Sequence, residues 1–192
     1  MKAYIDRVEP ERYEFISEDI LDRFNSREPD SIVKLAAIHR VFFQELSYHH
    51  SGSQPADPSD FFDRLSGDCQ DHGTALATLY KAAGLQPALL RVSERDRGLH
   101  HILVEVKNPL HSIDEACASL RRFYCNEFNQ FCPEIGYEKR SGDHWFVVDT
   151  AGDEDAGWSR YVGDITSHYG SCIEDKGSGE WDWYNLKQFQ EV

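Results

Sequence analysis

The sequence lacks any apolar run long enough to span a bilayer. Its first ten residues are charged where a secretory signal would carry an apolar core. Basic residues are also scarce: 20 Lys and Arg stand against 34 Asp and Glu, and the net charge of −14 repels nucleic-acid phosphates and anionic lipid headgroups. We therefore expect a soluble, cytoplasmic protein that binds neither nucleic acid nor a membrane.

Cysteine is the next scarce residue, with five copies and no C-x-x-C pair. An odd number without paired spacing argues against a disulfide framework, so we expect most thiols to be reduced. Cys117, Cys125 and Cys132 lie on one side of a predicted helix, near His111. Their spacing matches no common zinc pattern, which favours core packing over a metal site. The acidic run 153–155 similarly favours a solvated turn over a cation site, and no cofactor is predicted.

Repeats, low-complexity tracts and domain-splitting linkers are absent as well. Of the 192 residues, 40% are hydrophobic and 12% aromatic, which is enough to build a core. A chain of this length and composition predicts a single domain over residues 1–192.

Hydrophobic periodicity predicts two helices in the first half of the chain. Apolar residues recur at three- and four-residue intervals after Asp30 or Ser31, as on one face of a helix. A second helix is expected to open at Gly67-Asp68 and to run to about Ala83, where Gly84 stops it. Three strands are then predicted at residues 88–92, 101–106 and 145–149.

The stretch from residue 108 to 142 is too long to be a bare loop between two of these strands. Its apolar spacing predicts a helix from about Ser112 to Phe131, ending before Pro133. We interpret residues 108–142 as a helical insert packed on the sheet. The aromatic residues near Trp181 and Trp183 are expected to form a packed terminal element.

Cys69 falls in the first turn of the second predicted helix. Unsatisfied backbone N–H groups and the helix dipole favour a negative charge there, and the thiolate is the reactive form of cysteine. Asp68 and Asp71 oppose that charge. A nucleophilic Cys69 would therefore need a cationic partner, which in thiol enzymes is a histidine oriented by a third polar group.

Two strands can bring such a histidine and a carboxylate together. If the strands 101–106 and 145–149 pair antiparallel with His101 opposite Asp149, imidazole and carboxylate share one sheet face. A register shifted by one residue instead places His100 opposite Asp149 with equally apolar neighbours. The pattern alone leaves both histidines open.

Two other histidines have ordinary structural interpretations. His72 lies three residues after Cys69 on the same helix and is a rival base. Its predicted place is the wall or surface, because a base from the same helix leaves little room for substrate. His39 falls on the apolar face of the first helix, where a hydrogen-bonded core histidine is expected.

Several of these segments together resemble a known family. They resemble the transglutaminase-like core, which is similar to papain-type thiol enzymes. The segments that carry the resemblance are Gly67-Asp68-Cys69-Gln70-Asp71, the block from Ala83 to Ala88 (AGLQPA after the helix), the strand 101–106, and Trp145-Phe146-Val147-Val148-Asp149. The resemblance spans about residues 48–150. The family's histidine precedes a glutamate by four residues, as His101 precedes Glu105, which selects His101. Leu103 stands where the family usually has an aromatic residue.

The resemblance implies both a fold and an activity. The fold would be α+β, with N-terminal helices, a Cys-bearing helix packed on a small antiparallel sheet, and the helical insert. Cys69, His101 and Asp149 would perform acyl transfer or amide hydrolysis through a thioester on a glutamine or amide carbonyl of a peptide or protein. The alternative is a catalytically inactive module that binds a peptide or protein on the same scaffold.

Overall fold

The computed structural model describes residues 18–23, 31–49, 57–93, 100–128, 133–150, 159–164, 173–177, 179–183 and 190–191. Residues 18–23 are helical. The further helices in the described part are α3 (Ser31–Glu45), α4 (Pro58–Arg64), α5 (Cys69–Ala82) and α6 (Ile113–Phe128). The strands are β1 (Ser47–Tyr48), β2 (Ser66–Gly67), β3 (Pro87–Ser93), β4 (His100–Lys107), β5 (Tyr137–Arg140), β6 (Asp143–Val147), β7 (Ile173–Gly177), β8 (Glu180–Trp183) and β9 (Gln190–Glu191).

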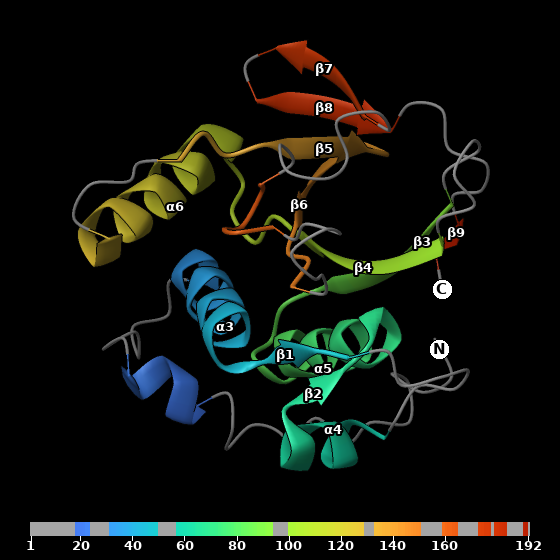
Figure 1. Cartoon of the computed structure of the whole chain (residues 1–192). Coiled ribbons are helices and arrows are strands. Elements are labelled where there is room, and N and C mark those ends of the chain that lie inside the picture. The colour runs from blue at the N-terminus through green and yellow to red at the C-terminus, as the bar shows by residue number, and fades with distance from the viewer. Residues whose placement is uncertain are drawn as a thin grey trace.

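The larger sheet has the strand order β7-β8-β5-β6-β4-β3-β9, and β1 and β2 form a separate short parallel pair. Within the larger sheet, β5 and β8 are parallel and the other pairs are antiparallel. Helix α5 packs on β3 and β4, while α3 packs against both α5 and α6 (Figure 1). The expected α+β class is confirmed, and the antiparallel sheet contains one parallel pair that the sequence did not indicate.

A glycine sets the distance between α5 and the sheet. A Cβ atom added at Gly73 would lie 3.1 Å from Ile102 and 3.2 Å from Leu89, so the helix backbone approaches these strand side chains directly. Both strand residues are buried, as is Val104 beside them. This close approach brings the first turn of α5 towards the start of β4.

The pairing of β4 with β6 differs from the predicted register by two residues. Glu105 pairs with Val147, and Val106 with Phe146, whereas the prediction placed Glu105 opposite Trp145. Because side chains alternate with a period of two, an even offset keeps each residue on its predicted face. The one-residue shift that would put His100 opposite Asp149 is also wrong.

Strand β6 is also shorter at its end than predicted. It spans Asp143–Val147, so Asp149 lies beyond its last residue. The Val148 amide still donates to the carbonyl of Val104, 2.9 Å away, and carries the chain along β4 for one more residue. Asp149 thus lies where β6 leaves the sheet, beside the start of β4.

The predicted helical insert contains both a helix and a strand. Helix α6 spans Ile113–Phe128, and residues 129–132, where the predicted helix would end, lie outside the described part. Residues 137–140 form β5, which pairs with β6 across the turn at Ser141 and Gly142. The last part of the segment 108–142 therefore belongs to the sheet, because the tight turn returns the chain directly into the next strand.

Charged side chains join β5 to the neighbouring strands. Glu105 on β4 is fully buried, and Arg140 lies 3.3 Å from its carboxylate and 3.8 Å from that of Glu138. The Arg140 guanidinium also lies over the Trp145 ring, 4.2 Å from the ring centroid. Buried carboxylates require such partners, so this cluster ties the β5–β6 hairpin to β4.

The cysteines have different bonding states. Cys69 and Cys117 are free thiols, whereas Cys125 takes part in a disulfide bond. The expectation that most thiols are reduced leaves room for this exception, which the sequence did not indicate because spacing cannot show which thiols meet in space. Within the described ranges, no helix has the length and apolar character needed to cross a membrane. The acidic run 153–155, for which a solvated turn was expected, lies outside the described part.

Candidate active site

The first turn of α5 is organised by two aspartates. The Asp68 side chain accepts hydrogen bonds from the amides of Gln70, at 2.8 Å, and Asp71, at 3.3 Å. The Asp71 carboxylate reaches back to the Asp68 amide at 3.1 Å, which completes a capping box. Both carboxylates, which the sequence suggested would oppose a thiolate at Cys69, are thus engaged with backbone N–H groups.

Gly67 is required by this cap. A Cβ atom added to Gly67 would lie 2.5 Å from both the Cβ and the Oδ2 atoms of Asp71. The β1–β2 pair holds the glycine in place, because the His49 amide donates to the Gly67 carbonyl at 2.8 Å. The motif Gly67-Asp68-Cys69 therefore has a local structural cause: it allows a tight entry into a capped helix that begins at the cysteine.

Two of the candidate residues meet in a buried contact. The Nε2 atom of His101 lies 2.7 Å from the Oδ2 atom of Asp149. The Asp149 side chain is 2% exposed and that of His101 13% exposed. Antiparallel pairing explains the contact, since the start of β4 and the residues after β6 lie at the same end of the sheet.

Cys69 interacts with the same imidazole. Burial alone would lower the pKa of His101, but the charge and hydrogen bond of Asp149, together with a hydrogen bond and charge interaction from Cys69, raise it from 6.5 to about 10. The carboxylate and the nearby cysteine therefore both favour the charged form of the imidazole. The structure thus brings Cys69, His101 and Asp149 together.

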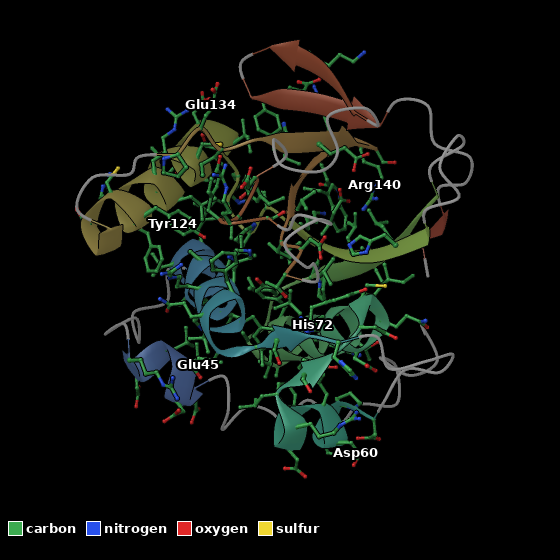
Figure 2. The ribbon with its side chains drawn as sticks, viewed as in Figure 1. Glu45, Asp60, His72, Tyr124, Glu134 and Arg140 are labelled. Atoms are coloured by element: carbon green, nitrogen blue, oxygen red, sulfur yellow. The ribbon has the colours of Figure 1, made fainter. Side chains whose placement is uncertain are left out.

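His72 is placed differently from the sequence-based expectation. It is buried on α5 beside the β1–β2 pair (Figure 2). Its Nε2 atom lies 3.2 Å from the Ser47 carbonyl, and its ring centroid lies 5.1 Å from that of Phe61. Burial lowers its pKa, against the opposing effects of the Ser47 hydrogen bond and the charge of Asp149. A neutral histidine bonded to backbone is a structural element rather than a rival base.

His39 on α3 lies in the core, close enough to Asp149 to interact with it. It is 0% exposed, and neither ring nitrogen has a partner of normal hydrogen-bond geometry in the described part of the chain. Burial lowers its pKa to about 4, although the nearby backbone of Ser159 and the charge of Asp149 favour its protonated form. The core position was predicted correctly, and the backbones of Ser159 and Asp149 are the nearby groups that favour a proton on its ring.

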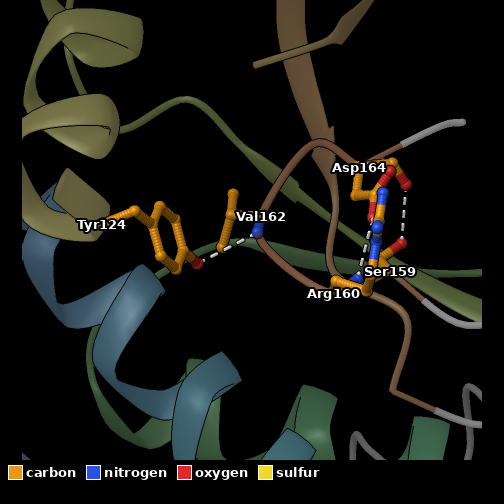
Figure 3. Close-up of polar contacts among 5 residues, drawn as sticks. All are labelled: Tyr124, Ser159, Arg160, Val162 and Asp164. Atoms are coloured by element: carbon orange, nitrogen blue, oxygen red, sulfur yellow. Dashed lines mark hydrogen bonds and ion pairs between the residues drawn. The ribbon is translucent and has the colours of Figure 1, made fainter. Parts of the chain in front are cut away.

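A loop that no sequence pattern indicates supports Asp149. The Ser159 amide donates to the Asp149 carbonyl at 3.0 Å, and the loop 159–164 is in turn bonded to Tyr124 on α6 (Figure 3). The apolar spacing of residues 112–131 indicates only that Tyr124 belongs to the apolar face of a helix. No motif marks the loop, because its role depends on backbone groups that every residue carries.

A cleft of about 640 Å³ lies at the opposite end of β4, away from Cys69. Its lining includes Gln86, Lys107, His111 and His144, and Lys107 forms an ion pair of 2.7 Å with Asp143 across it. Among the described residues, no group of three or more His, Cys, Asp or Glu side chains is arranged to hold a metal ion.

No family model and no curated protein match this chain. A solved structure from Parabacteroides distasonis, provisionally described as a protease, shares 12% identity over 55% of this chain and 23% of its own, with a TM-score of 0.46. Another, from Cytophaga hutchinsonii and provisionally described as a cysteine protease, shares 14% identity over 50% of this chain and 33% of its own, with a TM-score of 0.42. In both cases the match spans a third or less of the solved chain.

The capping box generates a prediction at Gly67. Gly67→Ala should lower the free energy of unfolding by about 1 to 2 kcal/mol, because the new methyl group displaces the Asp71 carboxylate from the cap. Urea denaturation measures this loss. In an Asp71→Gly background the same glycine substitution should cost less, since the Cβ and the carboxylate that the new methyl group would meet are both gone. Equal losses in the two backgrounds would contradict the argument.

The histidines around Asp149 predict a maximum of stability near pH 6.5. His39 binds a proton near pH 6.5 when unfolded but near pH 4 when folded, so stability should fall by about 3 kcal/mol as the pH drops across this interval. His101 binds its proton more tightly when folded, so its stabilising contribution is present below pH 6.5 and lost as the pH rises towards 10.

Urea denaturation from pH 4 to pH 10 tests both limbs of this profile. His39→Gln should flatten the acid limb and leave the alkaline limb unchanged. The matched control is His49→Gln, because His49 is exposed. An acid limb of unchanged slope in His39→Gln would show that another group causes it.

Proposed function

We propose that this protein is a cysteine-dependent enzyme that performs acyl transfer or amide hydrolysis through a thioester intermediate. The observation that carries the proposal is the 2.7 Å contact between His101 and the buried Asp149, beside a cysteine at the first turn of a capped helix. The resemblance of the same segments to the transglutaminase-like core supports it. The substrate class we propose is a glutamine or amide carbonyl in a peptide or protein.

Asp149 determines which nitrogen of the imidazole is available for chemistry. Because Nε2 of His101 is held by the carboxylate, Nδ1 is the nitrogen that exchanges a proton with the thiol. The raised pKa of His101 favours an imidazolium paired with a thiolate, which is the nucleophilic form of cysteine. Asp149 is thus an orienting and charge-stabilising group.

The reaction then proceeds in two halves. The Cys69 thiolate attacks the substrate carbonyl carbon, and the oxyanion that forms lies near the Cys69 backbone N–H at the N-terminus of α5. His101 gives its proton to the departing amine as the C–N bond breaks and the thioester remains. A water molecule or a second amine then loses a proton to His101 and attacks the thioester, which releases the Cys69 thiolate.

The charge of the protein bears on substrate choice. With a net charge of −14, the chain attracts neutral or basic peptides more strongly than acidic ones. The same long-range field disfavours nucleic acids.

Thiol reactivity tests the proposal without a known substrate. Iodoacetamide should label Cys69 rapidly below pH 7, and His101→Ala should slow that labelling at pH 6 by about a hundredfold, since a free thiol with a pKa of about 8.5 is almost fully protonated there. Mass spectrometry after labelling from pH 5 to pH 9 locates the modified cysteine and gives the rates.

Cys117 serves as a control within the same molecule. Burial raises the pKa of Cys117 to about 11, so its labelling should be slow and insensitive to His101→Ala. His72→Gln should leave Cys69 labelling intact, and Cys69→Ala should remove it. If Cys69 in the unaltered protein reacts only as an ordinary thiol, the enzyme proposal fails and a peptide-binding module without catalysis takes its place.

A further inference from the structure

The loop 159–164 holds the chain on both sides of Val148. The Ser159 amide donates to the carbonyl of Asp149 at 3.0 Å, and the Gly163 amide donates to that of Val147 at 2.8 Å. These bonds continue the backbone pairing after β6 has ended. The loop therefore determines how the backbone that carries the Asp149 carboxylate is oriented.

Side chains make this loop a closed unit. The Ser159 hydroxyl donates to the Asp164 carbonyl at 2.9 Å, while the amide and the Nε of Arg160 both donate to Asp164 Oδ2, at 3.1 and 2.9 Å. Asp164 is fully buried. The two ends of the loop are thus tied to each other, as Figure 3 shows.

Helix α6 supports the closed loop through one side chain. The hydroxyl of Tyr124 accepts a hydrogen bond from the Val162 amide at 3.0 Å (Figure 3). The Tyr124 ring is buried and packs edge-to-face against Tyr161, with centroids 6.0 Å apart. Burial raises the pKa of Tyr124, so the phenol stays neutral. This hydrogen bond lies within the loop, between Ser159 and Gly163, the two residues whose amides bond to the chain at the end of β6.

The orientation of the Asp149 carboxylate determines how strongly it interacts with His101. His101 contacts the carboxylate directly, while His39 on α3 and His72 on α5 lie close enough for its charge to favour their protonated forms. Burial keeps both of these histidines neutral at physiological pH, so His101 is the cation that Asp149 stabilises. A small rotation of the carboxylate away from His101 would weaken this pair.

We propose that Tyr124 is a positioning residue: through the Val162 amide it holds the loop 159–164, and the loop orients Asp149 towards His101. The link to catalysis rests on the proposed function, whereas the effect on His101 does not. Helix α6 thus takes part in the site through the hydroxyl of Tyr124. Besides packing against α3, the helix supports the backbone that carries the carboxylate.

Tyr124→Phe tests this inference, with Tyr80→Phe as the matched control. Tyr80 is also a fully buried tyrosine with one backbone partner, its hydroxyl donating to the Leu35 carbonyl at 3.2 Å, and this bond joins α5 to α3 rather than to the loop. Each variant loses a single hydroxyl from the core. They differ in whether that hydroxyl holds the loop.

The readout is the NMR titration of the His101 ring in the full-length protein, assigned with His101→Gln, alongside the iodoacetamide rate at Cys69. Tyr124→Phe should lower the His101 titration midpoint by about one pH unit, as expected for a weakened ion pair, and should slow Cys69 labelling at pH 6 by about tenfold. Tyr80→Phe should change neither quantity, even if its thermal stability falls by a similar amount.

Each alternative result is decisive. An unchanged midpoint in Tyr124→Phe overturns the inference, and so does an equal fall in Tyr80→Phe, which would indicate general loosening of the core. If Tyr124→Phe does not fold, Ser159→Ala removes the tie to Asp164 and should lower the midpoint in the same direction; no change there overturns the inference. If the midpoint falls as expected but Cys69 in the unaltered protein reacts as an ordinary thiol, the positioning role stands and the proposed chemistry fails.

Discussion

The arrangement of this fold depends on keeping one buried carboxylate, that of Asp149, against the imidazole of His101. Removing a carboxylate from water costs several kcal/mol unless a close partner and hydrogen bonds compensate. The compensation comes from distant parts of the chain. Strand β4 supplies the His101 imidazole, α5 supplies Cys69, which interacts with that imidazole, and the loop 159–164 bonds to the backbone of Asp149. The helix layer and the sheet have to meet at this end for the pair to exist.

Burial has opposite consequences for the histidines near that carboxylate. His39 and His72 have lowered pKa values because burial outweighs their distant attraction to Asp149, whereas direct contact raises the pKa of His101. A carboxylate can stabilise one adjacent cation strongly, but its effect decreases with distance while the cost of desolvation does not. Direct contact with Asp149 thus separates the charged imidazole of His101 from the neutral ones of His39 and His72.

Local patterns predicted the parts of the protein that depend on neighbouring residues. The helix beginning at Ser31, the helix beginning at Cys69 and the two central strands all follow from apolar periodicity, an aspartate cap and a glycine stop, which act within a few residues. The β4–β6 register was predicted two residues away from its true position, because apolar strands fit one another equally well at every even offset. The candidate residues nevertheless meet, since that offset preserves the sheet face.

Local sequence patterns are enough to predict that a cysteine begins a capped helix and that a histidine and an aspartate lie at one end of adjacent strands. Only the tertiary structure decided that His101 pairs with Asp149 at 2.7 Å, that His72 is bonded to backbone, and that Tyr124 supports the carboxylate. The physical reason is the range of the interactions. Caps and periodicity act within one or two turns, whereas the loop 159–164 is held by backbone groups that are identical in every residue and acquire a role only where the chain places them.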